Sequence, residues 1–218
     1  MSSSDENSRY NGGDNMFQIV KRLIEIARSE IGTVESPANS NRQKYGVAYG
    51  WNGVAWCVIF IWWLFHQLGL DHLLPKKTAS CSILIDAAKR AGLWLTVKDG
   101  LCVGDVVFYR FGNQNHVGYV VSVSSDGKTV TSIEGNTGTG NDANGGRVML
   151  RVRKISYVVG ALRPKYETVE QPKHMALVAQ ECADGKGGWG SGAERKAKLT
   201  AAGYDAAECN DTLIIVQS

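Results

Sequence analysis

Long apolar runs, clusters of basic residues and closely spaced cysteines are all missing from this chain of 218 residues. Its longest apolar run, from Val54 to Leu68, is too short to span a bilayer, so membrane insertion is not expected. The net charge of +3 comes without a Lys/Arg cluster, which argues against nucleic-acid binding. Residues 1–15 lack the apolar core of a secretory signal, and their polar composition predicts a disordered lead-in.

The cysteines show neither CxxC nor zinc-ligand spacing, and their number is odd: Cys57, Cys81, Cys102, Cys182 and Cys209. At least one thiol must therefore stay free or pair with another molecule. A loop over 138–146 offers oxygen ligands, but Asp142 is its only carboxylate, so we expect no tight calcium site. The sequence predicts neither a metal nor a cofactor.

The spacing of apolar residues changes once along the chain. Helical spacing predicts an amphipathic helix from Met16 to a break at Gly32, a buried helix over 54–68 and a short helix over 78–92, with Ile83, Leu84, Ala87 and Ala88 on its inner side. Five strand-like segments follow between residues 105 and 162. Helices first and strands second predict an α+β domain over 16–165, with the helices packed on an antiparallel sheet. A linker over 166–174 and a small three-helix module over 175–218 complete the expected organisation.

Cys57 is the candidate nucleophile, because it lies in the first turn of the predicted buried helix. The free backbone N–H groups and the positive dipole end of a helix N-terminus favour a thiolate. The alternative is that Cys57 is simply a packed core residue, since free cysteines are among the most buried residues.

A cysteine nucleophile needs a base, and the chain holds only four histidines. His116 is best placed, because it lies where the loop over 112–115 turns into a strand. His66 falls inside the predicted cysteine helix, His72 just past it, and His174 in the linker. His116 is therefore the candidate base.

The hairpin after His116 offers two registers that differ in whether a third group can orient the imidazole. A two-residue turn at Asp126-Gly127 would put Glu134 on the opposite face of the sheet from His116. A three-residue loop over 125–127, with Gly127 in a bulge, would put His116, Glu134 and Asn136 on one face. In that register Gly118 faces Glu134 and leaves room for its carboxylate. We expect the second register.

Taken together, several motifs resemble the CHAP domain, the papain-like cysteine, histidine-dependent amidohydrolase/peptidase of bacterial and phage cell-wall lytic enzymes. The resemblance spans residues 16–164 and is carried by segments in the family's order: 31–41, Trp56-Cys57, Gly104-Asp105, 115–118 and 133–137. It implies that Cys57 is the nucleophile, that His116 is the base and that Glu134 or Asn136 orients the imidazole. Asn52 is a candidate for holding the oxyanion, and Trp51 is a candidate substrate contact. Asp105 is expected to be a turn residue.

The last module resembles a single cell-wall-binding repeat of the Cpl-seven type, with Trp189 and Tyr204 as candidate sugar contacts. Cys182 and Cys209 depart from the repeat's pattern and are expected to be small core residues. The two resemblances imply a monomeric phage endolysin or bacterial autolysin that cleaves an amide bond in the peptidoglycan of Gram-positive bacteria. It would stay in the host cytoplasm until release to the wall. The alternatives are an amidase on another peptide conjugate and a wall-binding protein without catalysis.

Overall fold

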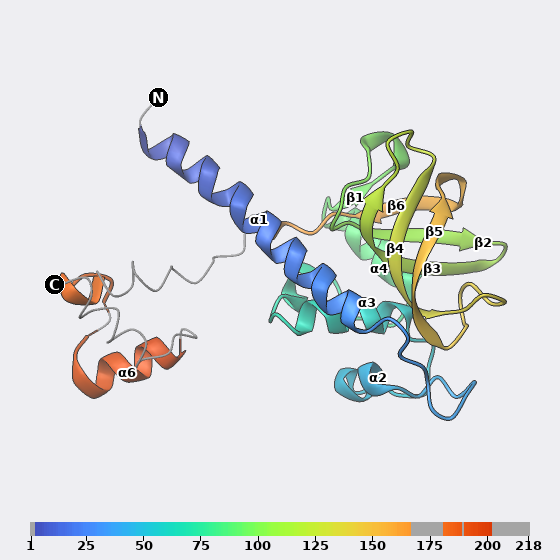
Figure 1. Ribbon diagram of the computed structural model, residues 1–218, viewed down its shortest axis with the longest axis horizontal. Helices are drawn as coiled ribbons and strands as arrows, with labels where there is room; N and C mark the ends of the chain where they lie inside the picture. The colour runs from blue at the N-terminus through green and yellow to red at the C-terminus, as the bar shows by residue number, and fades with distance from the viewer. Residues whose placement is uncertain (1–2, 167–180, 189, 202–218) are drawn as a thin grey trace. The chain divides into compact units, whose positions relative to one another are not determined.

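The computed structural model describes residues 3–188 and 190–201 except for 167–180, and it divides the chain into two compact units, Met1–Thr168 and Val169–Ser218 (Figure 1). The first unit holds four α-helices and a six-stranded antiparallel sheet. The expected α+β class is therefore confirmed for the part of the chain that the structure describes.

The first helix, α1, spans Ser3–Ser29, thirteen residues further toward the N-terminus than expected. The disordered lead-in predicted over 1–15 is thus wrong for the backbone from Ser3 onward. Burial of Ile19, Val20, Leu23 and Ala27 fixes the second half of α1 on the domain. Extending an existing helix adds one hydrogen bond for each residue fixed, so the polar segment continues the helix even though composition disfavours it.

Three further helices lie between α1 and the sheet strands in sequence. They are α2 (Lys44–Tyr49), which the sequence analysis missed, α3 (Cys57–His66) and α4 (Cys81–Arg90). Every residue of α3 from Cys57 to Phe65 is buried, as expected for an apolar helix inside the core. In α4, Leu84, Ala87 and Ala88 are buried as predicted, but Ile83 is 48% exposed. Three short 3₁₀ helices complete the set: η1 (Asp71–Leu73), η2 (Val97–Asp99) and η3 (Ile155–Tyr157).

The sheet has the strand order β1-β6-β2-β3-β4-β5. Its strands are β1 (Trp94–Leu95), β2 (Val106–Phe111), β3 (Gln114–Val123), β4 (Thr129–Thr137), β5 (Arg147–Lys154) and β6 (Val158–Leu162). The five predicted strands are all present, and β1 is an addition at the edge. Helix α3 packs against β3 and β4.

Close contact between α3 and the sheet depends on Gly135 in β4. A Cβ atom at this position would lie 2.5 Å from Cβ of Phe60, so only glycine lets the helix approach the strand so closely. The N-terminus of α3, with Cys57, is thereby brought to the end of β4 that carries Glu134.

Tyr166, placed in the linker by the sequence analysis, belongs to the first unit. Its hydroxyl donates to the Gly104 carbonyl at 2.7 Å and contacts the Tyr119 hydroxyl at 3.1 Å, and its ring stacks on Phe65. The rest of the predicted linker lies outside the described residues. The first unit therefore includes Tyr166, because its large aromatic ring is buried in the core.

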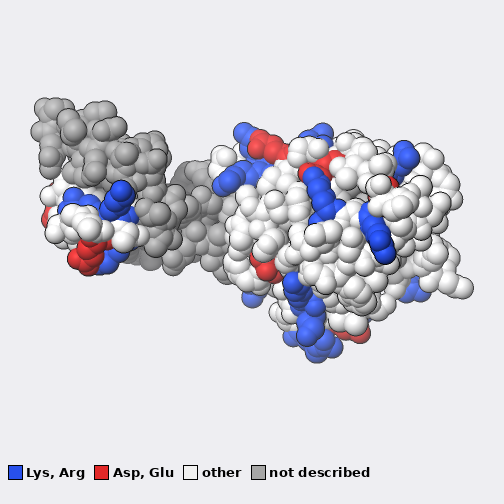
Figure 2. Space-filling model, turned by 90° about the horizontal axis from the view of Figure 1, so that it is seen from below, with Lys and Arg blue, Asp and Glu red and all other residues white. Residues whose placement is uncertain are grey.

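In the second unit, the structure describes helix α6 (Gly192–Ala201) and a further helical stretch at residues 181–183, and the predicted three-helix arrangement over 175–218 stays a prediction. Cys182 and Leu199 are buried there. Across the described residues, no helix combines the length and apolar character needed to cross a bilayer. On the face drawn in Figure 2, Lys and Arg side chains are interspersed with acidic and uncharged surface.

Candidate active site

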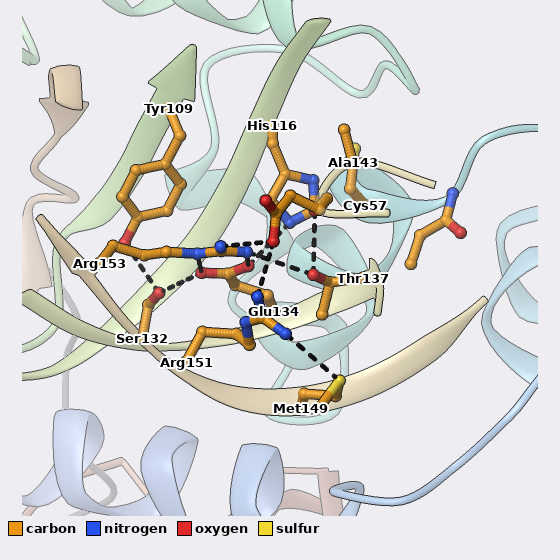
Figure 3. Close-up of polar contacts among 12 residues, drawn as sticks. Cys57, Tyr109, His116, Ser132, Glu134, Thr137, Ala143, Met149, Arg151 and Arg153 are labelled. Carbon is orange, nitrogen blue, oxygen red and sulfur yellow. Dashed lines mark hydrogen bonds and ion pairs between the residues drawn. The ribbon is translucent and has the colours of Figure 1, made fainter. Parts of the chain in front are cut away.

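Cys57 is the first residue of α3, with Trp56 as the helix cap. Its side chain is 5% exposed, and it lies beside the His116 ring (Figure 3). The N–H groups of a first helical turn have no acceptor within the helix, and the Val58 N–H hydrogen-bonds the Cys57 sulfur, so this turn can stabilise negative charge there. The predicted position in the first turn is confirmed, although the helix begins later than the expected 54–55.

His116 and Glu134 meet across the β3–β4 hairpin. Nε2 of His116 donates to Oε2 of Glu134 at 3.1 Å, and both side chains are fully buried. Gly118 supplies the space, because a Cβ atom there would lie 2.8 Å from Cγ of Glu134. The structure therefore brings together the base and the orienter that the sequence analysis proposed.

The expected register is present at this site, but its cause is different. Near the turn, Ser122 pairs with Thr131 and Val123 with Val130, the register expected for a two-residue turn. A bulge between Val120 and Ser122 then shifts the pairing by one residue, so that Tyr119 faces Ile133. A bulge changes which side chains share a face, and here it moves Glu134 to the His116 side. The bulge predicted at Gly127 was wrong, although Gly127 does adopt a positive φ of 66°.

Arg153 of β5 also holds the Glu134 carboxylate, and it shares Oε2 with His116 (Figure 3). Its Nε donates to Oε1 at 2.9 Å and its Nη2 to Oε2 at 2.6 Å, a two-pronged ion pair with only 6% of the Arg153 side chain exposed. Ser132 donates to Oε1 at 2.8 Å and in turn accepts from the Tyr109 hydroxyl at 2.8 Å. Four donors from three strands thus fix both oxygens of Glu134.

Asn136, predicted as an alternative orienter, does not contact His116. It has a positive φ of 58°, which turns it out of the strand's alternation. Its Nδ2 donates to Oδ1 of Asn144 at 2.9 Å, and its Oδ1 accepts from the Gly146 N–H at 3.2 Å. Asn136 therefore fixes the 138–146 loop, and the orienting group on His116 is Glu134.

The loop over 138–146 lies next to the site and is tied to the same arginine. Asp142 accepts from Arg153 Nη1 and from Arg151 Nη2, each at 2.6 Å. Within the described part of the chain no three acidic, histidine or cysteine side chains gather as a metal site would need. The Asp142 carboxylate is instead an ion-pair partner of both arginines.

The electrostatics favour a charged pair between thiolate and imidazolium. A hydrogen bond from the Cys81 thiol, followed by the hydrogen bond and charge of His116, holds the pKa of Cys57 well below its usual value despite burial. Burial lowers the pKa of His116, but hydrogen bonds and negative charges from Cys57 and Glu134 outweigh it and raise the value to about 9. Between these two values Cys57 is ionised while His116 carries a proton to donate.

The two nitrogens of His116 are in different situations. Nε2 is engaged by Glu134, and among the described residues Nδ1 has no hydrogen-bond partner of normal geometry. Nδ1 is thus the nitrogen left for proton exchange with Cys57 and with a bound substrate. For Glu134, burial raises the pKa, but the hydrogen bonds and charges of His116 and Arg153 bring it below the usual value. The orienter is therefore a carboxylate at neutral pH.

The predicted substrate residues are distributed differently. Trp51 is 56% exposed, as a surface contact requires. Oδ1 of Asn52 accepts from the backbone N–H groups of Gln43 and Gly53, both at 3.1 Å, so Asn52 fixes the loop before Cys57, and its role with the oxyanion stays a prediction. Trp189 and Tyr204 lie outside the described residues. Asp105 behaves as expected: it accepts from the Cys102 N–H at 2.8 Å and pairs with Arg163.

Alkylation by iodoacetamide should report the Cys57 thiolate directly. The ordinary pKa of a thiol is about 8.5, and we expect the alkylation rate at Cys57 to reach half its maximum well below that pH. In His116→Gln the pH of half-maximal rate should rise, because this variant removes one cause of the ionisation of Cys57. Quantitative mass spectrometry of the Cys57 peptide measures the rate, with the exposed Cys102 as reference in the same sample. An unchanged profile in His116→Gln would contradict the pairing.

Turnover should respond to pH differently from alkylation. It should fall again above about pH 9, where His116 loses the proton that it must donate, whereas alkylation needs only the thiolate and should continue.

Residues 48–136 match the family described as the CHAP domain, a segment that includes Cys57, His116, Glu134 and Asn136. No curated protein and no solved structure matches the chain. The match supports a CHAP-domain protein and a hydrolase of the amidase or peptidase kind.

Proposed function

We propose that this chain, with its CHAP-domain match over 48–136, is a peptidoglycan hydrolase that cleaves an amide bond through a thioester on Cys57. The observation that carries the proposal is the buried sequence of contacts from Cys57 through His116 to Glu134, with Arg153 behind it. A cysteine, a base and an oriented carboxylate in this order form the constellation of a thiol hydrolase.

In the proposed reaction the Cys57 thiolate attacks the amide carbonyl, and the resulting oxyanion lies near the N–H groups of the first turn of α3. His116 gives its Nδ1 proton to the departing amine, which leaves a thioester. A water molecule then enters, His116 takes its proton, and hydroxide displaces Cys57 as a thiolate. Glu134 holds the imidazole in place and stabilises its positive charge in both halves of the cycle.

Arg153 limits how strongly Glu134 attracts the imidazolium proton. A carboxylate that already accepts two charged hydrogen bonds from an arginine shares its negative charge between two cations. His116 can then keep its proton at neutral pH and still release it to a leaving amine. The ion pair with Arg153 thus has a role in the proposed chemistry as well as in packing.

We further propose that the protein acts as an endolysin on Gram-positive walls, with residues 175–218 as a wall-binding module. A small module of this size binds weakly by itself, and its benefit would come from keeping the catalytic unit close to an insoluble substrate with many sites. In this proposal the protein is a monomer, and it acts outside the membrane after its release from the host cytoplasm.

Mass spectrometry of digested wall fragments tests the function and identifies the bond. Purified peptidoglycan incubated with the full chain should release fragments with one new amine and one new carboxyl end. A free amine on L-Ala of the stem peptide would identify an amidase, and a new end inside the stem or bridge an endopeptidase. Glycan fragments with new reducing ends and intact peptides would contradict amide cleavage. A digest with no new ends would favour a wall-binding protein without catalysis.

A further inference from the structure

A second cysteine lies against the nucleophile, and its own sulfur takes part in no bond-making step of the proposed reaction. Cys81 is the first residue of α4, just as Cys57 is the first residue of α3. Their sulfur atoms are 3.9 Å apart, and the two side chains are 7% and 5% exposed. Two helix N-termini thus bring two free thiols into contact inside the site.

From this contact we propose that Cys57 and Cys81 form a peroxide-sensitive thiol pair, in which oxidised Cys57 is captured by Cys81 as a reversible disulfide. The loss of catalysis that follows rests on the proposed function, whereas the disulfide itself depends only on the two thiols. The class of reactant is a hydroperoxide, with hydrogen peroxide as the simplest member.

The two thiols differ in pKa, and the direction of the difference suits this chemistry. Cys81 donates to Cys57, which keeps Cys57 ionised, and the same hydrogen bond together with burial raises the pKa of Cys81 well above its usual value. Cys57 is therefore the sulfur that attacks a peroxide, because the thiolate is the reactive form. Cys81 keeps its proton until the second step.

Both steps balance with the peroxide as the only oxidant. The Cys57 thiolate attacks one peroxide oxygen, the O–O bond breaks, and the departing hydroxide takes a proton to give water and a sulfenic acid. The Cys81 sulfur then attacks the Cys57 sulfur, the S–O bond breaks, and hydroxide leaves with the Cys81 proton as a second water. Two thiols lose two electrons in total, and one peroxide is reduced to two waters.

The geometry requires only a small movement. The sulfurs must approach by about 1.9 Å to reach the bonded separation of about 2.05 Å. Each cysteine begins its helix, where no preceding turn of the same helix restricts the side chain. The bond would cover the nucleophile and would also prevent further oxidation to sulfinic acid, which thiols do not reverse.

Peptide mapping of the full chain tests the proposal without any activity assay. After treatment with hydrogen peroxide and blocking of free thiols, digestion without reductant should yield a Cys57–Cys81 linked peptide, lighter than the two free peptides by two hydrogen atoms. Dithiothreitol should return both thiols. Absence of the linked peptide, or a link from Cys57 to another cysteine, would overturn the proposal even if the protein hydrolyses walls normally.

Variants at position 81 provide a second test of the same proposal. In Cys81→Ser, and in Cys81→Ala if the serine is poorly tolerated in this buried place, peroxide should drive Cys57 to sulfinic acid. Recovery of alkylatable Cys57 by dithiothreitol should then fall by roughly an order of magnitude relative to wild type. Cys102→Ser, at an exposed thiol, is the matched control and should recover like wild type. These variants also lose the hydrogen bond that keeps Cys57 ionised, so each is treated until Cys57 has lost its alkylation to the same extent as in wild type before dithiothreitol is added. Equal recovery after this matched oxidation would show that Cys81 does not resolve the oxidised nucleophile.

Discussion

Replacement of Cys57 with alanine should abolish amide cleavage, with a loss on the order of 10⁴-fold or more in kcat/KM. The thiolate forms the bond to substrate, and no other nucleophile among the described residues lies against His116 in this way. Release of new amine ends from purified peptidoglycan measures the effect, and the fall in turbidity of a wall suspension gives a second readout.

Two further variants make this result specific. Cys57→Ser keeps the size of the side chain but replaces an ionised thiol with a hydroxyl that His116 would have to deprotonate, so it should be nearly as inactive. Cys102→Ala removes an exposed thiol and should retain full activity. Clearance of walls by Cys57→Ala at the wild-type rate would show that the proposed nucleophile is wrong.

Arg153→Met should destabilise the first unit by about 3–5 kcal/mol, because it leaves the buried Glu134 carboxylate without its charged arginine partner. Activity should fall as well, since Glu134 would then be free to move away from His116 or to take up a proton. Urea unfolding measures the first effect, and kcat/KM for amine release measures the second.

The pH dependence of this loss follows from the direction of the Glu134 shift. A lowered carboxyl pKa contributes stability above the unfolded value of about 4.3, and that contribution disappears as pH falls through the lower folded value. The difference in stability between Arg153→Met and wild type should therefore be largest near neutral pH and shrink on acidification. A difference that is constant with pH would indicate lost packing instead of lost charge compensation.

Arg151→Met is the matched control. Arg151 pairs with the same Asp142 but does not contact Glu134, and Asp142 is 41% exposed, so its loss should cost less than about 1 kcal/mol. The double variant Glu134→Gln/Arg153→Met removes both buried charges. It should regain part of the stability of Arg153→Met, yet remain slow because His116 has lost its charged orienter. Full activity in Glu134→Gln alone would exclude Glu134 from that role.

Some parts of this site could be read from sequence because they depend on local rules. A long apolar segment with Cys57 at its head predicts a buried helix, and two-residue alternation places Glu134 on one face with His116 once the register is known. The register itself was correct at the site for a different reason from the one proposed. The residues around Val121 give no sign of the bulge that the structure has there. Gly127, in contrast, is of the residue type that a bulge commonly contains, although no bulge is present at that position.

Arg153 and Cys81 could not be predicted, because each is defined by a contact across the fold. Alternation in β5 would bury Val152 and expose Arg153, but Val152 is 66% exposed and Arg153 is buried. The ion pair with Glu134 reverses the usual preference, since a buried charge is tolerated where its partner is buried too. Cys81 lies 24 residues from Cys57 with no spacing motif, and it reaches the nucleophile because α4 and α3 both pack against β3.

The order of strands in the sheet has a consequence for how this chain is made. The last strand in sequence, β6, lies between β1 and β2, so the sheet stays divided until residues 158–162 are available. During synthesis from the N-terminus, β1 and β2 would present unpaired edges long after they leave the ribosome, and such edges attract other strands. Contacts between distant parts of a sequence also slow folding.

The site is completed late for the same reason. The proposed nucleophile, base and orienter have all been synthesised once the chain reaches residue 134. The buried charge on Glu134 gains its arginine counter-ion only when Arg153 follows, and the sheet closes only after that. A nascent chain therefore carries the proposed catalytic groups well before it can hold them in the arrangement seen in the folded protein.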